Sequence, residues 1–197
     1  MAATHKLSHH EAEANDRAMF GFWVYLMTDL LMFAILFAVY AVLHNNTVGG
    51  ETGRELFSLP LALTETIILL TSSFTCGIAM IAVRKGNKAQ TIGWFMVTFL
   101  LGLAFLTLEL REFSALIHEG HTLRSNAFMS SFFVLVGTHG LHIISGLLWM
   151  AVTLGYTIKR GLTASMTRKL SMLSLFWHFL DIVWIFIFTI VYLGAFV

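Results

Sequence analysis

The chain has 197 residues, of which 57% are hydrophobic and 12% are charged, and its formal net charge is +1. Soluble domains contain about 45–50% apolar and about 25% charged residues, so the composition excludes an ordinary soluble protein. No basic patch marks a nucleic-acid partner. Long apolar runs without ten-residue alternation predict an all-α, polytopic membrane protein and not a transmembrane barrel.

The N-terminal stretch, positions 1–19, is a polar tail that contains His5, His9 and His10. Three histidines in a short tail are able to bind a metal, but a solvated cytoplasmic terminus is the simpler expectation. The apolar run that follows has no cleavage site of small residues. We therefore expect a retained span and not a signal peptide.

Five apolar runs reach the roughly 20 residues that a transmembrane helix needs. They predict one five-helix domain over residues 20–197, with spans at about 20–43, 61–83, 91–117, 127–158 and 171–197. Pro60 precedes the second span, where the first turn of a helix tolerates proline. Within that span, Ser73 and Gly77 form a small-xxx-small pair typical of close helix packing in lipid.

Basic residues favour one side of this arrangement. Three of the twelve, Arg54, Arg111 and Arg124, fall on the side of the first and third loops. Cytoplasmic loops carry an excess of Lys and Arg, which predicts a cytoplasmic N-terminus and a periplasmic C-terminus. The other nine are Lys6, Arg17, Arg84, Lys85, Lys88, Lys159, Arg160, Arg168 and Lys169.

Aspartate, glutamate and histidine side chains fall within these spans, where such groups face protein or a water-filled cavity because lipid does not solvate them. A rise of about 1.5 Å per residue predicts two layers whose members lie close together. The inner layer holds Asp29, His178 and Asp181, the outer layer holds Glu65, Glu109, His139 and His142, and Glu112 follows Glu109 near the end of the third span.

Three interpretations of these layers stay open. Hydrogen bonds between histidines and carboxylates stabilise helix pairs, and intramembrane Asp, Glu and His also relay protons. Carboxylates and histidines in helical bundles also hold di-iron centres, but the typical Glu-x-x-His pairing is missing here. No nucleotide-binding loop, HExxH motif or nucleophile elbow appears. We expect no catalytic, cofactor-binding or metal-binding residue, and a subunit of a larger assembly.

Two motifs indicate a family. Residues 137–146 read Gly-Thr-His-Gly-Leu-His-Ile-Ile-Ser-Gly, and residues 177–184 read Trp-His-Phe-Leu-Asp-Ile-Val-Trp. In this order and spacing the chain resembles subunit III of the haem-copper respiratory oxidases, and residues 105–113, with Glu109 and Glu112, resemble the acidic segment of that family. The five-span form and the run 20–29 look most like subunit III of bacterial cytochrome o ubiquinol oxidases. Asp29 matches a carbodiimide-reactive glutamate of the family.

The resemblance implies a non-catalytic subunit in the bacterial inner membrane. Subunit I is expected to carry the haems and copper and to contact this chain directly, with subunits II and IV also in the complex. The five helices would form a V-shaped pair of bundles with phospholipid in the cleft. The chain would support assembly, lipid binding and proton uptake by subunit I, in a complex that oxidises ubiquinol, reduces dioxygen and pumps protons.

Other functions remain as alternatives. The donor site is expected on other subunits, so residue chemistry alone leaves subunit III of a cytochrome c oxidase open. A stand-alone membrane metalloenzyme would use Glu65, Glu109, His139 and His142. A proton-coupled transporter is the third alternative, although no paired broken helices or repeat halves are present.

Overall fold

The computed structural model of the chain describes residues 9–44, 58–120 and 126–196. Five helices in these ranges are long and apolar enough to cross a membrane, and the described secondary structure is helical, which confirms the all-α five-span prediction. The expectations for His5, Lys6, Arg54 and Arg124 lie outside the described residues. The helices are α1 (His9–Leu43), α3 (Leu59–Arg84), α4 (Lys88–His118), α5 (Ala127–Arg160) and α6 (Ala164–Ile187), followed by the π-helical η1 (Phe188–Tyr192) and the 3-10 helix η2 (Leu193–Phe196).

Polar capping residues set the starts of three helices. The Asn87 side chain accepts a hydrogen bond from the Gln90 amide at the start of α4. The Asn126 side chain accepts one from the Met129 amide at the start of α5. Thr163 caps α6 by accepting from the Met166 amide. Such caps satisfy amides that have no partner inside the helix. α6 therefore begins at Ala164, before the expected start of the last span at about residue 171, and α5 continues to Arg160.

The polar tail also differs from the expectation. Helix α1 begins at His9 and continues into the first span, so the tail is helical from residue 9 onwards. The side chain of Arg17 forms an ion pair with Glu13 at 3.0 Å, and both side chains are exposed. Pairs four residues apart stabilise exposed helices modestly. Residues 9–19 are therefore helical, and the exposed side chains of Glu13 and Arg17 agree with a solvated tail.

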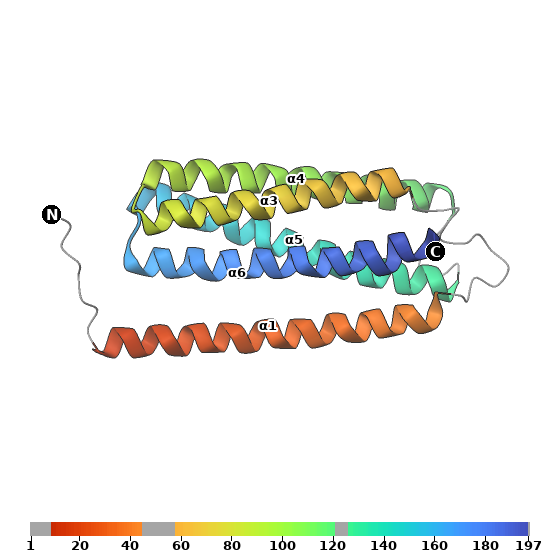
Figure 1. The fold of residues 1–197 in the computed structure, drawn as a ribbon, viewed down its shortest axis with the longest axis horizontal. Helices are drawn as coiled ribbons and strands as arrows, with labels where there is room; N and C mark the ends of the chain where they lie inside the picture. The colour runs from red at the N-terminus through yellow and green to blue at the C-terminus, as the bar shows by residue number, and fades with distance from the viewer. Residues whose placement is uncertain (1–8, 45–57, 121–125, 197) are drawn as a thin grey trace.

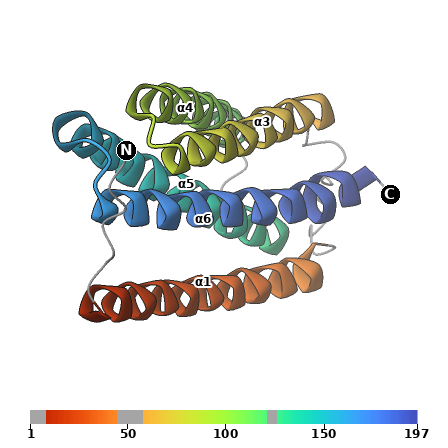
Figure 2. The ribbon, with the colours of Figure 1, turned by 60° about the vertical axis from the view of Figure 1, so that its left-hand side comes forward.

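Helices α3, α4, α5 and α6 form a bundle, and α1 lies alongside it (Figures 1 and 2). α1 packs mainly against α5, through ring contacts of Phe22 with Trp149 at 5.9 Å and of Tyr40 with Phe128 at 6.2 Å. The expected V-shaped pair of bundles is therefore wrong for the described residues. One four-helix bundle takes its place, with α1 packed singly against α5 and α6.

The core of the bundle is built around Trp177, which is fully buried. Its ring lies between Gly102 of α4 and Gly146 of α5, where an added Cβ would come within 2.8 Å and 3.1 Å of the indole. Its Nε1 donates to the Ser72 hydroxyl of α3. Later in α6, Nε1 of Trp184 donates to the hydroxyl of Thr66, which comes earlier in α3. These partners advance in opposite directions on α3 and α6, so the two helices pack antiparallel.

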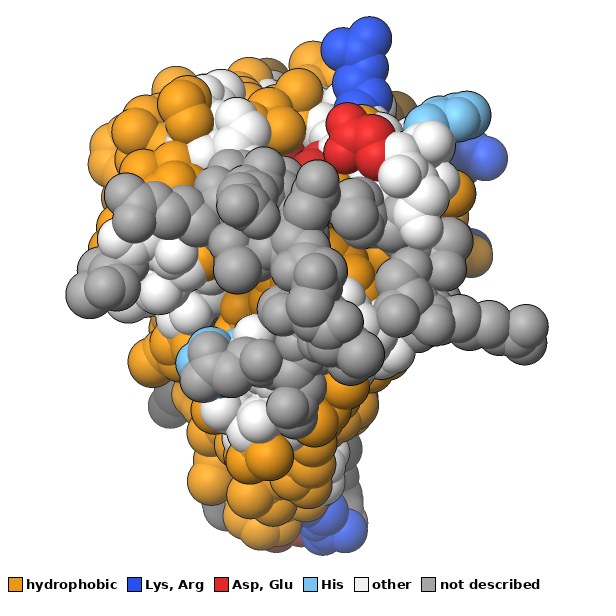
Figure 3. Space-filling view, turned by 90° about the vertical axis from the view of Figure 1, so that its right-hand side faces the viewer, with side chains coloured by type: hydrophobic (Ala, Val, Ile, Leu, Met, Phe, Trp, Pro, Cys, Tyr) orange, Lys and Arg blue, Asp and Glu red, His pale blue; other side chains and the backbone are white. Residues whose placement is uncertain are grey.

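The sides of the molecule are apolar. Figure 3 looks onto the end of the bundle where the C-terminus lies, and hydrophobic side chains cover the flanks visible in that view. Large exposed hydrophobic residues include Phe20, Leu31, Phe74, Leu100 and Leu148. A hydrocarbon environment solvates such a surface, which agrees with the span prediction.

Candidate intramembrane polar site

Three glutamates form an acidic cluster near the C-terminal end of the bundle. Glu65 comes from α3, and Glu109 and Glu112 come from α4. Each is at most 7% exposed, and Glu109 interacts electrostatically with the other two. The Tyr192 hydroxyl donates a hydrogen bond to Glu112 at 2.8 Å. The structure thus brings Glu65 and Glu109 together, as the outer layer predicts, and adds Glu112 and Tyr192 to them.

Most oxygens of the acidic cluster lack partners. Among the described residues, both carboxylate oxygens of Glu65, both of Glu109 and Oε1 of Glu112 accept no hydrogen bond. Burial of unpaired carboxylates is costly. Gly140 makes room for one of them, because a Cβ at this position would lie 3.1 Å from Oε1 of Glu109. The glycine between the two histidines of the 137–146 motif therefore serves the packing of Glu109.

His139 of α5 is fully buried, and its contacts are with α4 and α6. Its Nε2 donates to the carbonyl of Leu180 at 3.3 Å, and its ring lies 5.1 Å from Trp184 and 5.8 Å from Phe105. The histidine therefore links α5 to α6. This contact agrees with the structural interpretation of the layers.

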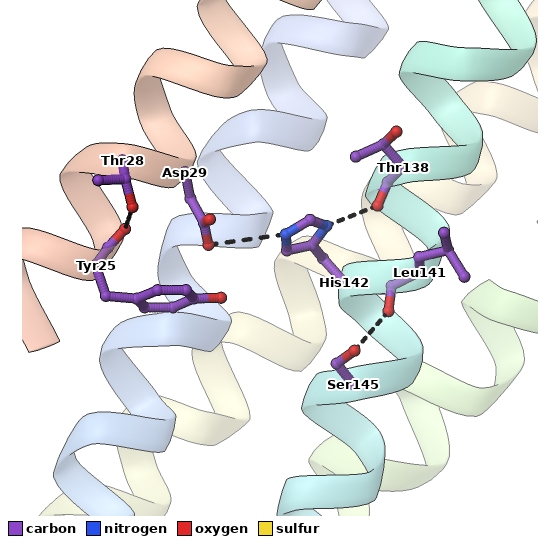
Figure 4. Close-up of polar contacts among 7 residues, drawn as sticks. All are labelled: Tyr25, Thr28, Asp29, Thr138, Leu141, His142 and Ser145. Carbon is purple, nitrogen blue, oxygen red and sulfur yellow. Dashed lines mark hydrogen bonds and ion pairs between the residues drawn. The ribbon is translucent and has the colours of Figure 1, made fainter.

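His142 joins α5 to α1 (Figure 4). Its Nδ1 donates to the carbonyl of Thr138 at 2.7 Å, and its Nε2 lies 3.7 Å from Oδ2 of Asp29. Tyr25, one turn before Asp29, also interacts with the carboxylate. The ring of Phe33 lies 5.3 Å from the imidazole and packs beside the polar contact.

The placement of Asp29 and His142 in different layers is therefore wrong. Asp29 lies just past the middle of α1, and His142 lies close to the middle of α5, which starts at the end of the bundle where α1 finishes. The two residues are thus at one height. A depth for Asp29 taken from the start of the apolar run at residue 20 is too small, because α1 begins at His9.

His178 and Asp181 form a second polar group with Ser73 of α3. The Ser73 hydroxyl lies 2.6 Å from Nδ1 of His178, and Ser73 also hydrogen-bonds the Asp181 side chain. The expected pairing of His178 with Asp181 is present as an electrostatic interaction. Ser73, which the sequence suggested only as a packing residue, is the additional partner.

The described residues contain no group of three or more His, Cys, Asp and Glu side chains that is suited to a metal ion. Of the four candidates for a metal centre, His142 contacts Asp29 and the Nε2 of His139 contacts a backbone carbonyl. This geometry gives the metalloenzyme alternative no support. The polar residues connect pairs of helices. Such side chains stabilise the packing of the helices or hold protons.

Sequence reasoning missed three residues that hold these groups in place. Tyr192 donates to Glu112, Ser73 pairs with His178, and Gly102 accommodates Trp177. The small residues of α3 and α4 carried a signal, since small residues permit close helix approach. Tyr192 carried none, because an aromatic residue near the end of an apolar run is typical of a membrane interface.

Comparison with known proteins gives a consistent result. The family model described as cytochrome c oxidase subunit III matches residues 1–196. Cytochrome bo(3) ubiquinol oxidase subunit 3 of Pseudomonas aeruginosa is 53% identical over 98% of this chain and 94% of its own length. Quinol oxidase subunit 3 of Bacillus subtilis is 45% identical over 93% of this chain and 90% of its own. Cytochrome c oxidase subunit 3 of Bacillus sp. strain PS3 is 44% identical over 88% and 84%.

Proposed function

The chain belongs to the cytochrome c oxidase subunit III family, and we propose that it serves as subunit III of a ubiquinol oxidase in a bacterial inner membrane. The observation that carries the proposal is the 53% identity, over nearly the whole of both chains, to a protein named as that subunit of a cytochrome bo(3) ubiquinol oxidase. A relative named as a quinol oxidase subunit, at 45% identity, supports the same electron donor. A cytochrome c oxidase remains the second candidate, because one relative at 44% identity has that name.

We propose a supporting and not a catalytic role within the complex. The described polar residues connect helices in pairs, through Asp29 with His142, Ser73 with His178 and Tyr192 with Glu112. Each contact stabilises the packing of two helices. These side chains are not arranged around a substrate. Haems and copper belong, in this proposal, to subunit I, which contacts this chain directly, and subunits II and IV complete the assembly.

A phospholipid is the ligand that fits this chain best. A cleft of about 500 Å³ lies between α1 and α6, and this α1/α6 cleft is apolar apart from His178. Aromatic rings line both sides of it, and acyl chains are solvated by such walls. The lining includes Trp23, Phe33 and Phe37 of α1 and Phe179, Val183 and Phe186 of α6.

The proposed orientation has the N-terminus in the cytoplasm and the C-terminus in the periplasm. Among the described residues, Arg84, Lys85, Lys88, Lys159 and Arg160 all lie at the end of the bundle where α3 and α5 end and α4 begins. An excess of basic residues at one membrane face marks the cytoplasmic side.

Deletion of the chain from its own organism tests the supporting role. We expect membranes of the deletion strain to hold less assembled haem-copper oxidase, measured as haem absorbance and ubiquinol-dependent oxygen uptake, and a plasmid copy of the chain to restore both. Unchanged oxidase content and stability without the chain would contradict the proposal.

A further inference from the structure

The acidic cluster of Glu65, Glu109 and Glu112 is sealed inside the bundle. Glu65 is fully buried, Glu109 is 2% exposed and Glu112 is 7% exposed. The five oxygens of the cluster that accept no hydrogen bond from the described residues have essentially no accessible surface. Neither a lipid nor another subunit can therefore reach these oxygens with a donor or a cation. Whatever neutralises the cluster has to act from within the folded chain.

The described side chains around the cluster give it one hydrogen bond. The Tyr192 hydroxyl of η1 donates to Oε2 of Glu112 at 2.8 Å. The described residues whose charges act on Glu109 are the other two glutamates, and Tyr192 interacts electrostatically with all three. The described part of the chain thus offers three carboxyl groups a single donor.

Helix α5 meets Glu109 with a glycine and not with a donor. A Cβ at Gly140 would lie 3.1 Å from Oε1 of Glu109, so the backbone of α5 borders the carboxyl group directly. The preceding residue, His139, donates from Nε2 to the carbonyl of Leu180, and its Nδ1 has no partner among the described residues. The histidine therefore donates to α6 and not to a glutamate of the cluster.

A proton is the ligand that this arrangement requires. The effective penalty for burying an unpaired ion in a protein is several kcal/mol. Carboxylates that share a site also repel one another, so they do not all ionise together. A buried carboxyl group avoids both costs when it binds a proton and becomes neutral. Because the Tyr192 hydroxyl stabilises a charge on Glu112, Glu112 is the member that stays ionised.

We propose that the acidic cluster is a buried proton-binding site, in which Glu65 and Glu109 are neutral carboxylic acids and Glu112 is the carboxylate. Each of the two acids binds one proton from water, and an O–H bond forms on one carboxyl oxygen. Each O–H group is then a donor inside the cluster, which the bare carboxylates lack. The inference goes beyond the proposed supporting role, because it gives this chain a ligand of its own.

The site lies close to one membrane face. Glu65 is six residues past Leu59 at the start of α3, and Glu112 is six residues before His118 at the end of α4. At about 1.5 Å per residue, both lie roughly 9 Å from the same end of the bundle. Protons therefore exchange with this end, which is the periplasmic side in the proposed orientation.

Infrared spectroscopy of the oxidase purified through a tag on this chain tests the protonation states. Glu65→Gln and Glu109→Gln keep the shape and the neutral charge of a carboxylic acid, so the variants should assemble. At neutral pH each should lose one carboxylic-acid C=O band relative to the wild type, and that band should shift to lower frequency in D2O. Either variant alone suffices for the test.

Two controls should lose carboxylate absorbance instead. Glu112→Gln removes the proposed carboxylate, and Glu119→Gln removes an exposed side chain next to the end of α4. Loss of carboxylate absorbance by Glu65→Gln and Glu109→Gln would overturn the proposal. Loss of a carboxylic-acid band by Glu112→Gln would overturn the assignment of the charge.

Tyr192→Phe provides a test that leaves all three glutamates in place. Without the donating hydroxyl, Glu112 has no partner for its charge among the described residues. We expect this variant to gain one carboxylic-acid band that shifts in D2O and to lose carboxylate absorbance. A spectrum identical to that of the wild type would contradict the part assigned to Tyr192.

The two proposals fail in different ways. If the wild-type chain brings down no haem-bearing subunit, the proposed function fails, while the infrared spectra of the purified chain still decide on the proton-binding site. If haem co-purifies and the glutamine variants lose only carboxylate absorbance, the oxidase assignment stands and the proton-binding site is lost.

Discussion

Oδ2 of Asp29 lies 3.7 Å from Nε2 of His142, and this contact joins α1 to α5 at the height of the α1/α6 cleft. Ring contacts between the same two helices lie towards either end, at Phe22 with Trp149 and at Tyr40 with Phe128. The polar pair is thus one of several attachments of α1. It couples Asp29 to the second histidine of the 137–146 motif.

We expect Asp29→Asn to leave oxidase turnover largely intact. A polar contact between membrane helices contributes about 0.6 kcal/mol on average, or roughly a threefold change in an equilibrium. The ring contacts along α1 remain in the variant, and His142 keeps its hydrogen bond to Thr138. The measurement is ubiquinol-dependent oxygen uptake per haem in the purified complex. Near-complete loss of activity with unchanged assembly would show that the carboxylate is an obligatory proton carrier.

Tyr192→Phe should destabilise the complex. The change removes the hydroxyl that donates to Glu112 within the acidic cluster. Loss of a hydrogen bond to a buried acceptor costs about 1–3 kcal/mol. Tyr156→Phe is the control, because Tyr156 is 48% exposed and its contact with Arg160 uses the ring. Thermal inactivation midpoints compare the two, and an equal shift for both would contradict a stabilising role of the Tyr192 hydroxyl.

Gly102→Ala should also destabilise the fold, although alanine is the better helix former. The new Cβ would lie 2.8 Å from the Trp177 ring, which has no free space around it. Overpacking of this kind costs about 1–3 kcal/mol. Gly93→Ala on the same helix meets no neighbour, so there the helix propensity of alanine should stabilise the chain by up to about 1 kcal/mol. Shifts of the same sign at both positions would argue against the clash.

Thiol labelling tests the orientation. Cys76 is buried, so a second cysteine at an exposed helix end reports on its own side of the membrane. In intact spheroplasts, a reagent that does not cross membranes should label Glu119→Cys and spare Lys85→Cys. Both positions are exposed and lie at opposite ends of the bundle. The reverse pattern would place the N-terminus in the periplasm.

The number and approximate position of the helices could be predicted because an apolar run long enough to cross a bilayer is a strong signal. The helix starts could not, since single polar residues such as Asn87 and Thr163 set them. An apolar run shows where lipid begins and not where the helix begins. For the same reason the N-terminal extension of α1 to His9 was missed.

The candidate site was predictable in its residues but only partly in its contacts. Buried carboxylates and histidines stand out in an apolar sequence, and Glu65 with Glu109 could be paired by depth. The pairing of Asp29 with His142 depends on which face of α1 meets α5. Nearly all of α1 within the span is apolar, so the sequence offers little information about that face. The Ser73 contact was missed because many serines in membrane helices bond only to their own backbone. The Tyr192 contact was missed because an aromatic residue near the end of an apolar run is typical of a membrane interface.

Purification from native membranes through a tag on this chain tests the central claim most directly. An optical spectrum, a subunit gel and oxygen uptake with ubiquinol and with reduced cytochrome c should be recorded on one sample. The account predicts haem absorbance, co-eluting larger subunits and oxygen uptake driven by ubiquinol. A colourless single chain, or a haem-bearing complex that oxidises only cytochrome c, would contradict it.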